Sequence, residues 1–130
     1  MNLPNALTTA ELFGGYSETR GSAPAILVPG RKPLNYERLH AHIVETVRAL
    51  NDMGIGRNHR LGIVAPSGAE AGVMSEVAQS AMPHITLNPA HSLPEFVTLM
   101  RRLKLAVIVI VDGLDTAAWQ AACLLMPRWP

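Results

Sequence analysis

Cysteine is almost absent from this sequence. Cys123 is the single cysteine among 130 residues. One thiol cannot form an internal disulfide, which excludes a small disulfide-stabilised scaffold and is compatible with a reducing compartment. Because Cys123 lies within the apolar stretch AACLL, we expect it to be a buried small hydrophobic residue and not a reactive thiol.

Charge of either sign is also scarce. Lys and Arg number 11 against 10 Asp and Glu, and charged residues make up 16% of the chain, compared with about 25% in a typical domain. Proteins that bind nucleic acid or anionic membranes usually carry a clear basic excess, so we expect neither partner. At 48% hydrophobic residues the chain is too apolar for disorder and long enough to form a core.

Long hydrophobic runs and export signals are missing as well. The longest wholly apolar run is LAVIVIV, Leu105–Val111, far short of the roughly 20 residues that span a bilayer. The first residues lack a basic start followed by an apolar stretch. We therefore expect a soluble, cytoplasmic protein.

Short apolar runs alternate with helical periodicity along the chain, which is typical of an α/β fold. The pattern predicts a layered, mainly parallel sheet with crossover helices and a small N-terminal hairpin. We expect parallel strands near residues 60–65, 84–88 and 106–111 and the hairpin near 25–35. The β-branched run LAVIVIV favours a parallel strand covered on both faces.

Local signals place the helices. Asn35 can cap a helix with an apolar stripe that Gly54 ends, and small residues at 68–81 predict a second helix close to the sheet. Ser92 and Glu95 have the spacing of a capping box after the Asn-Pro break, and a last helix is expected from Asp115 through Met126. The apolar stripe of the first of these helices comprises Leu39, Ile43, Val47 and Leu50.

Several motifs follow one another in order: AILVPGRKPLNYERL, MGIGRNHRLGIVAPSGAE, HITLNPAH and LAVIVI. Together they resemble the N-terminal segment of the adenylate-forming (AMP-binding) acyl-CoA synthetase and ligase superfamily. The resemblance covers residues 23–111, and ITLNPAHSLPEF is most similar to the oxalate-CoA ligase-like branch. It implies that residues 1–130 are a single partial α/β domain, with an atypical tail at 112–130.

The sequence departs from the family pattern at Met82-Pro83, at Thr86 and at Asn58-His59-Arg60, and it also lacks the later motifs. Met82-Pro83 stands where the family usually has Gly-Ala, which puts the packing of the helix-to-strand junction in doubt because Pro83 lacks a ladder donor. The Ser/Thr/Gly-rich phosphate loop of the TSGTTGxPK kind, the ribose-binding acid and the lysine of the mobile domain are absent. The resemblance implies ATP, Mg²⁺ and CoA for a full-length member, and no cofactor for this chain.

No residue is assigned a catalytic, cofactor-binding or metal-binding role. The turn at Pro66–Gly72 does not fit G-x-G-x-x-G, and its plain structural role is favoured over nucleotide binding. We interpret His40 and His42 as solvated helix histidines, and His84 and His91 as a strand-end and a loop histidine. Arg101, Arg102 and Lys104 form a basic helix end. The two lysines of the chain, Lys32 and Lys104, are isolated from any catalytic motif.

Two functions remain open. The first is an N-terminal fragment of an ATP-dependent acyl-activating ligase, inactive alone. The second is a non-enzymatic α/β module that associates with itself or with a partner chain through sheet edges and apolar faces. We expect the partner to be a second copy or the remainder of the ligase.

Overall fold

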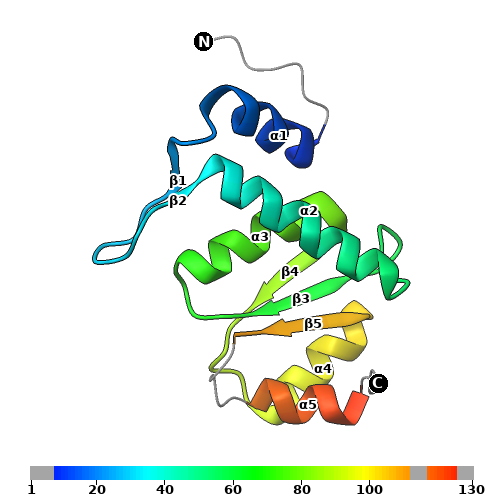
Figure 1. Ribbon diagram of the computed structural model, residues 1–130. Helices are drawn as coiled ribbons and strands as arrows, with labels where there is room; N and C mark the ends of the chain where they lie inside the picture. The colour runs from blue at the N-terminus through cyan, green and yellow to red at the C-terminus, as the bar shows by residue number, and fades with distance from the viewer. Residues whose placement is uncertain (1–7, 112–116, 126–130) are drawn as a thin grey trace.

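The computed structural model describes residues 8–111 and 117–125, and these ranges contain five helices and five strands, arranged as in Figure 1. The helices are α1 (Thr9–Arg20), α2 (Tyr36–Asp52), α3 (Ala69–Ala81), α4 (Leu93–Leu103) and α5 (Ala117–Leu125). The strands are β1 (Pro24–Ile26), β2 (Leu34–Asn35), β3 (Leu61–Val64), β4 (His84–Leu87) and β5 (Val107–Ile110).

The main sheet has three parallel strands in the order β4-β3-β5. Leu61 at the start of β3 lies opposite His84 on one side and Val107 on the other. Helices α2 and α3 cover one face of this sheet, and α4 and α5 cover the other (Figure 1). The α/β class, the parallel strands and the layered architecture predicted from the sequence are confirmed.

A separate antiparallel hairpin precedes α2, as expected. Its turn runs from Val28 to Arg31, where the Arg31 N–H donates to the Val28 carbonyl at 3.1 Å. Gly30 has φ +75°, which an L-residue rarely adopts, and Pro29 pre-sets the position before it. The turn therefore has the type II character that the Pro-Gly pair predicted.

The predicted signals for α2 and α3 are also confirmed. The side chain of Asn35 accepts a hydrogen bond from the Arg38 N–H at 2.9 Å, and Gly54 lies just past the end of α2 with φ +78°. The small residues of α3 bring it close to the sheet, with Ala78 fully buried. Of the predicted stripe on α2, Leu39, Ile43 and Leu50 are buried, and Val47 packs against the same core.

Strand β3 is the most deeply buried strand, and the prediction that β5 is a parallel strand covered on both faces is confirmed, although β5 is only half-buried. All four residues of β3 are buried, whereas all four residues of β5 are only half-buried. The reason is topological, since β5 pairs with β3 alone and lies at an edge of the sheet. Its β-branched residues nevertheless alternate between the two cores, with Val107 and Val109 on the α2/α3 face and Ile108 and Ile110 on the α4/α5 face.

The junction at Met82-Pro83 packs without loss of a ladder bond. Pro83 precedes β4, and its carbonyl accepts a hydrogen bond from the Leu61 N–H at 3.0 Å. Met82 is extended, as a residue before proline prefers, and it is buried in the core on the α2/α3 face. The doubt that the sequence raised about this junction is therefore removed.

Helix α4 begins and ends at well-defined caps. Ser92 Oγ accepts from the Glu95 N–H at 3.4 Å, and the Ser92 N–H donates to Glu95 Oε2 at 2.7 Å, which confirms the capping box. The hydrogen bonds to Ser92 hold the pKa of the Glu95 carboxyl below its usual value. At the other end Arg60 donates to the Leu103 carbonyl at 3.0 Å, tying the helix to the start of β3.

Lys104 ends α4 in the left-handed conformation, with φ 52° and ψ 51°. A side chain at such a position is strained, and glycine relieves the strain. We expect Lys104→Gly to raise the free energy of unfolding by about 0.5–1 kcal/mol, measured by urea denaturation. Lys104→Ala removes the same charge but keeps a Cβ, so an equal gain from alanine would show that charge, and not backbone strain, is responsible.

Helix α1 was not predicted. Its N-terminus carries a second capping box, in which Thr8 and Glu11 exchange hydrogen bonds at 3.2 and 3.1 Å. The T-x-x-E spacing was therefore a usable signal. The helix has no buried residue, so it lacks the apolar stripe on which the other helix predictions depended.

The tail prediction is only partly open to comparison. The described part of the last helix is Ala117–Leu125, while Asp115, Met126 and most of the atypical tail lie outside the described residues. In the ranges that the structure covers, no helix combines the length and hydrophobicity needed to cross a bilayer.

Candidate functional site

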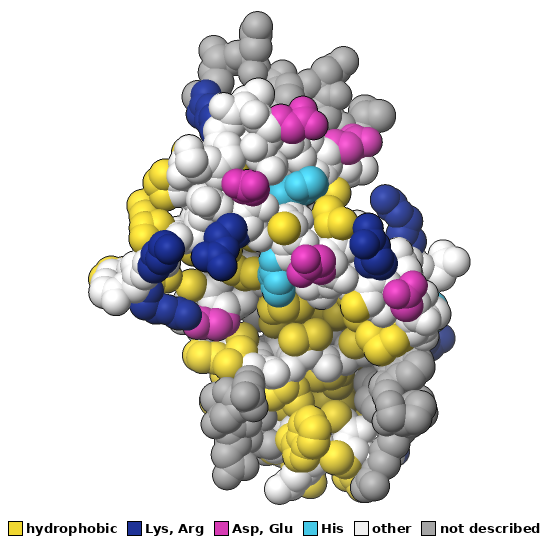
Figure 2. Space-filling view, viewed as in Figure 1, with side chains coloured by type: hydrophobic (Ala, Val, Ile, Leu, Met, Phe, Trp, Pro, Cys, Tyr) yellow, Lys and Arg dark blue, Asp and Glu magenta, His cyan; other side chains and the backbone are white. Residues whose placement is uncertain are grey.

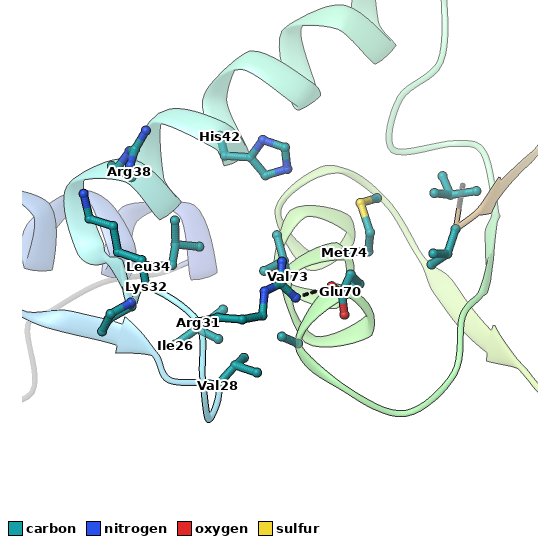
Figure 3. A pocket seen from close by; sticks show the side chains of 14 residues that line it. Ile26, Val28, Arg31, Lys32, Leu34, Arg38, His42, Glu70, Val73 and Met74 are labelled. Carbon is teal, nitrogen blue, oxygen red and sulfur yellow. Dashed lines mark hydrogen bonds and ion pairs between the residues drawn. The ribbon is translucent and has the colours of Figure 1, made fainter. Parts of the chain in front are cut away.

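A cavity of about 580 Å³ lies between the hairpin, α2, α3 and the end of β5, and we call it the hairpin pocket. Its size falls within the range of about 300–1,000 Å³ that is usual for binding sites. Figure 3 shows the hairpin and α2 side chains on one side and the α3 side chains facing them. The described lining residues are Ile26, Val28, Arg31, Lys32, Pro33, Leu34, Arg38, His42, Ala69, Glu70, Val73, Met74, Val109 and Val111.

An ion pair connects the hairpin to α3. Arg31 Nη1 donates to Glu70 Oε1 at 2.5 Å across the pocket (Figure 3). The hydrogen bond from Arg31 lowers the pKa of the Glu70 carboxyl, so this group stays ionised at neutral pH. Both side chains are more than half exposed, so the pair positions the turn and adds little to stability.

The pocket has an apolar floor and a basic mouth. The floor is formed by aliphatic side chains of the hairpin, α3 and β5, with Met74 among them. Lys32 and Arg38 are exposed at the mouth, and neither forms an ion pair with any described residue. Since Glu70 balances Arg31, the mouth keeps an excess of positive charge from Lys32 and Arg38.

This arrangement is suited to binding. The described lining residues include no hydroxyl or thiol nucleophile, and their one carboxylate is engaged by Arg31. A covalent or general-base mechanism needs a nucleophile and a base in mutual reach. The aliphatic floor and the cations Lys32 and Arg38 at the mouth suit an occupant that is apolar along most of its length and anionic at one end.

Sequence reasoning missed this pocket, apart from naming Lys32 and His42 for other reasons. Arg31 and Glu70 are 39 residues apart, so no local pattern connects them. The available signal was indirect: a basic turn, GRKP, follows an apolar strand in a chain with few charges.

The predicted helix histidines differ from one another in the structure. His42 is exposed and lines the hairpin pocket, as a solvated residue would. His40 is half-buried against α1, since a Cβ on Gly14 would lie 3.3 Å from His40 Nε2. The prediction that both histidines are solvated is therefore wrong for His40, because α1 covers it.

The structure separates the two histidines that were considered as a pair near a strand end. His84 lies at the amino end of β4, and His91 follows its carboxyl end. His91 packs edge-on against Phe96, with ring centroids 5.5 Å apart, and its Nδ1 lies 3.4 Å from Glu95 Oε2. His91 thus belongs to the cap of α4 and forms no common site with His84.

The remaining candidates lie at the surface. Arg101 and Arg102 are exposed in the last turn of α4, beside Lys104. Cys123 is exposed on α5, so the prediction of a buried cysteine is wrong. Helix α5 buries Ala118 and Ala121 on its inner face, which leaves Cys123 on the outer face. No group of three or more potential metal ligands is found within residues 8–111 and 117–125.

Comparisons with solved structures define the class of fold. The chain shares its fold with part of several larger solved proteins. Neither a protein-family model nor a curated protein matches the sequence. At 14–17% identity the matched structures show a shared fold and leave function open.

Three of these structures illustrate the match. IdnL1 superposes with a TM-score of 0.73 at 16% identity, over 87% of this chain and 23% of its own. The nonribosomal peptide synthetase FmoA3, bound to α-methyl-L-serine-AMP, gives 0.73 at 17% identity, over 88% and 13%. VinN gives 0.76 at 14% identity, over 96% and 34%, and has also been solved with L-aspartate. This chain thus spans about a third or less of each of these three proteins.

Proposed function

We propose that this chain is part of the N-terminal scaffold of an ATP-dependent acyl-activating ligase of the acyl-CoA synthetase-like kind. The observation that supports this most strongly is the fold match, which covers 87–96% of this chain but only 13–34% of the three structures. The motif order across residues 23–111 agrees with it independently, because it resembles the same superfamily.

The parent reaction would join a carboxylate to ATP, releasing pyrophosphate, and then pass the acyl group from the adenylate to CoA. Holding ATP phosphates requires several converging N–H donors and cations. The sequence contains no Ser/Thr/Gly-rich phosphate loop, and we assign ATP, Mg²⁺ and CoA to the rest of the ligase. The role of residues 1–130 is then to support the acyl-binding region.

The branch within the superfamily is a narrower proposal. It depends on the stretch ITLNPAHSLPEF, Ile85–Phe96, which is most similar to oxalate-CoA ligase-like proteins. None of the structures named above supports this branch over others.

The 130-residue chain alone should show no ATP–pyrophosphate exchange with any carboxylic acid, and no micromolar ATP binding by calorimetry. Lys32 lies at the hairpin pocket and Lys104 at the end of α4, and neither stands beside a Ser/Thr/Gly-rich loop whose N–H groups could hold a phosphate. Acid-dependent exchange that Lys32→Ala or Lys104→Ala abolishes would contradict the proposal and identify a minimal enzyme.

One observation favours the second candidate, an interaction module that associates with itself or a partner chain. In the described part of the chain, no strand pairs with the outer side of β5. An unpaired apolar edge recruits other chains.

The open edge predicts self-association of the chain in isolation. We expect dimers or larger assemblies in sedimentation velocity at tens of micromolar, because pairing satisfies backbone groups at the edge and covers apolar surface. A single monomeric species over that concentration range would contradict the prediction.

A further inference from the structure

The outer edge of β5 presents unpaired backbone groups. The Val111 N–H donates to the Val64 carbonyl at 3.2 Å, continuing the ladder between β3 and β5. Because the backbone groups of successive strand residues point to opposite sides, those of Ile108 and Ile110 point away from β3. No strand in the described ranges lies on that side.

The two edges of the sheet differ in how they are protected. Strand β4 is flanked by Pro83 and Pro89, which cannot donate to an added strand. Strand β5 reads Val-Ile-Val-Ile and carries neither a proline nor a charge. Edge strands usually carry such protective residues, so β5 is the edge suited to accept another strand.

The hairpin pocket adjoins this edge. Val109 and Val111 line the pocket from the β5 side, together with Val73 and Met74 of α3. Figure 2 shows a broad hydrophobic area on this face, bordered on its upper left by Lys and Arg side chains. In a strand added to β5, every second side chain would therefore point toward the hairpin pocket. The far side of this pocket carries the positive charges of Lys32 and Arg38, which have no ion-pair partner among the described residues.

We propose that the outer edge of β5 captures an extended segment that is apolar in its middle and acidic at an end. The backbone groups of Ile108 and Ile110 supply the hydrogen bonds, the pocket takes the apolar side chains, and Lys32 and Arg38 attract the acidic group. A second copy of this chain would bring the same two cations to the interface, so it binds less tightly than an acidic segment. Strand capture and acyl activation are separate properties, and the exchange assay above leaves strand capture untouched.

The test uses two synthetic peptides with blocked ends, Glu-Thr-Val-Thr-Val-Thr-Glu and its partner with both glutamates replaced by lysine. The glutamates and valines share one face, whichever way the strand runs. We expect the acidic peptide to bind the full chain at least about tenfold more tightly than the basic one, by calorimetry at low salt. Arg38→Glu, an exposed substitution, leaves Lys32 balanced by the new carboxylate and should abolish this preference, and Arg48→Glu on the same helix, also exposed but outside the pocket, should leave it intact.

Two further readouts identify strand addition. The Ile108 and Ile110 amides should become protected from hydrogen exchange when the acidic peptide binds, while the Thr86 amide, which faces the outer edge of β4, is unchanged. Of two peptides N-methylated at odd or at even positions, one should lose binding and the other retain it, because alternate amides face β5. The acidic peptide should also dissociate the assemblies that the chain forms alone.

Three results would overturn strand capture at β5. The first is equal affinity for the acidic and basic peptides, and the second is binding without protection of Ile108 and Ile110. The third is protection of these amides by self-association that excess acidic peptide does not reverse, which would make a second copy the occupant.

Discussion

Phe96→Ala should lower the free energy of unfolding by about 3–5 kcal/mol, which is a large share of the stability of a domain this size. Phe96 is 0% exposed and is the largest fully buried side chain in the described part of the chain. It lies in the core between α4, α5 and the sheet, with Leu87 and Met100 among its cluster. Truncation would remove the ring and leave a cavity that rigid neighbours fill only in part. Urea denaturation followed by circular dichroism measures the change.

Thr98→Ala is the matched control, because Thr98 is exposed two residues further along the same helix. Its effect should stay within about 0.5 kcal/mol, since it touches no buried contact. If Phe96→Ala cost no more than this control, α4 would not be packed on the sheet as described.

Gly62→Val should lower the free energy of unfolding by about 1–3 kcal/mol through overpacking. A Cβ at Gly62 would lie 2.8 Å from Leu105 Cδ1 and 3.5 Å from Leu87 Cδ1, so buried leucines on that face would have to shift. Valine adds two methyl groups beyond this Cβ. The loss should exceed the small gain from the better strand propensity of valine.

Gly72→Ala provides the contrast for Gly62. A Cβ at Gly72 would meet nothing within 4 Å, and the residue lies inside α3. We expect a gain of about 0.5–1 kcal/mol, because alanine is favoured over glycine in helices. A stable Gly62→Val protein with unchanged denaturation midpoint would show that Leu105 and Leu87 do not pack on β3 as closely as the structure places them.

The sequence predicted those features whose signals lie within a few residues of each other. The Pro29-Gly30 turn and the capping box of Ser92 and Glu95 are of this kind, because short backbone geometry alone decides them. Helix α2 was predicted as well, since its apolar stripe has a fixed spacing. Helix α1 shows the limit of this approach, since its capping box has no apolar stripe to accompany it.

Features that depend on strand order could not be predicted in this way. The β-branched composition of β5 predicted cover on both faces, but not that its place beside β3 alone leaves it half-buried. The exposure of Cys123 depends on which face of α5 meets the sheet, which the apolar stretch AACLL does not specify. The hairpin pocket required the turn at Arg31 to meet α3 at Glu70, a contact between distant parts of the chain.

The proposal that this chain is part of an adenylate-forming ligase is tested most directly by sequencing its transcript beyond the Pro130 codon. We expect the downstream nucleotides to encode a Ser/Thr/Gly-rich phosphate loop of the TSGTTGxPK kind, in the same reading frame or in one of the other two. A transcript that encodes no such loop in any frame would contradict the proposed function and favour the interaction module.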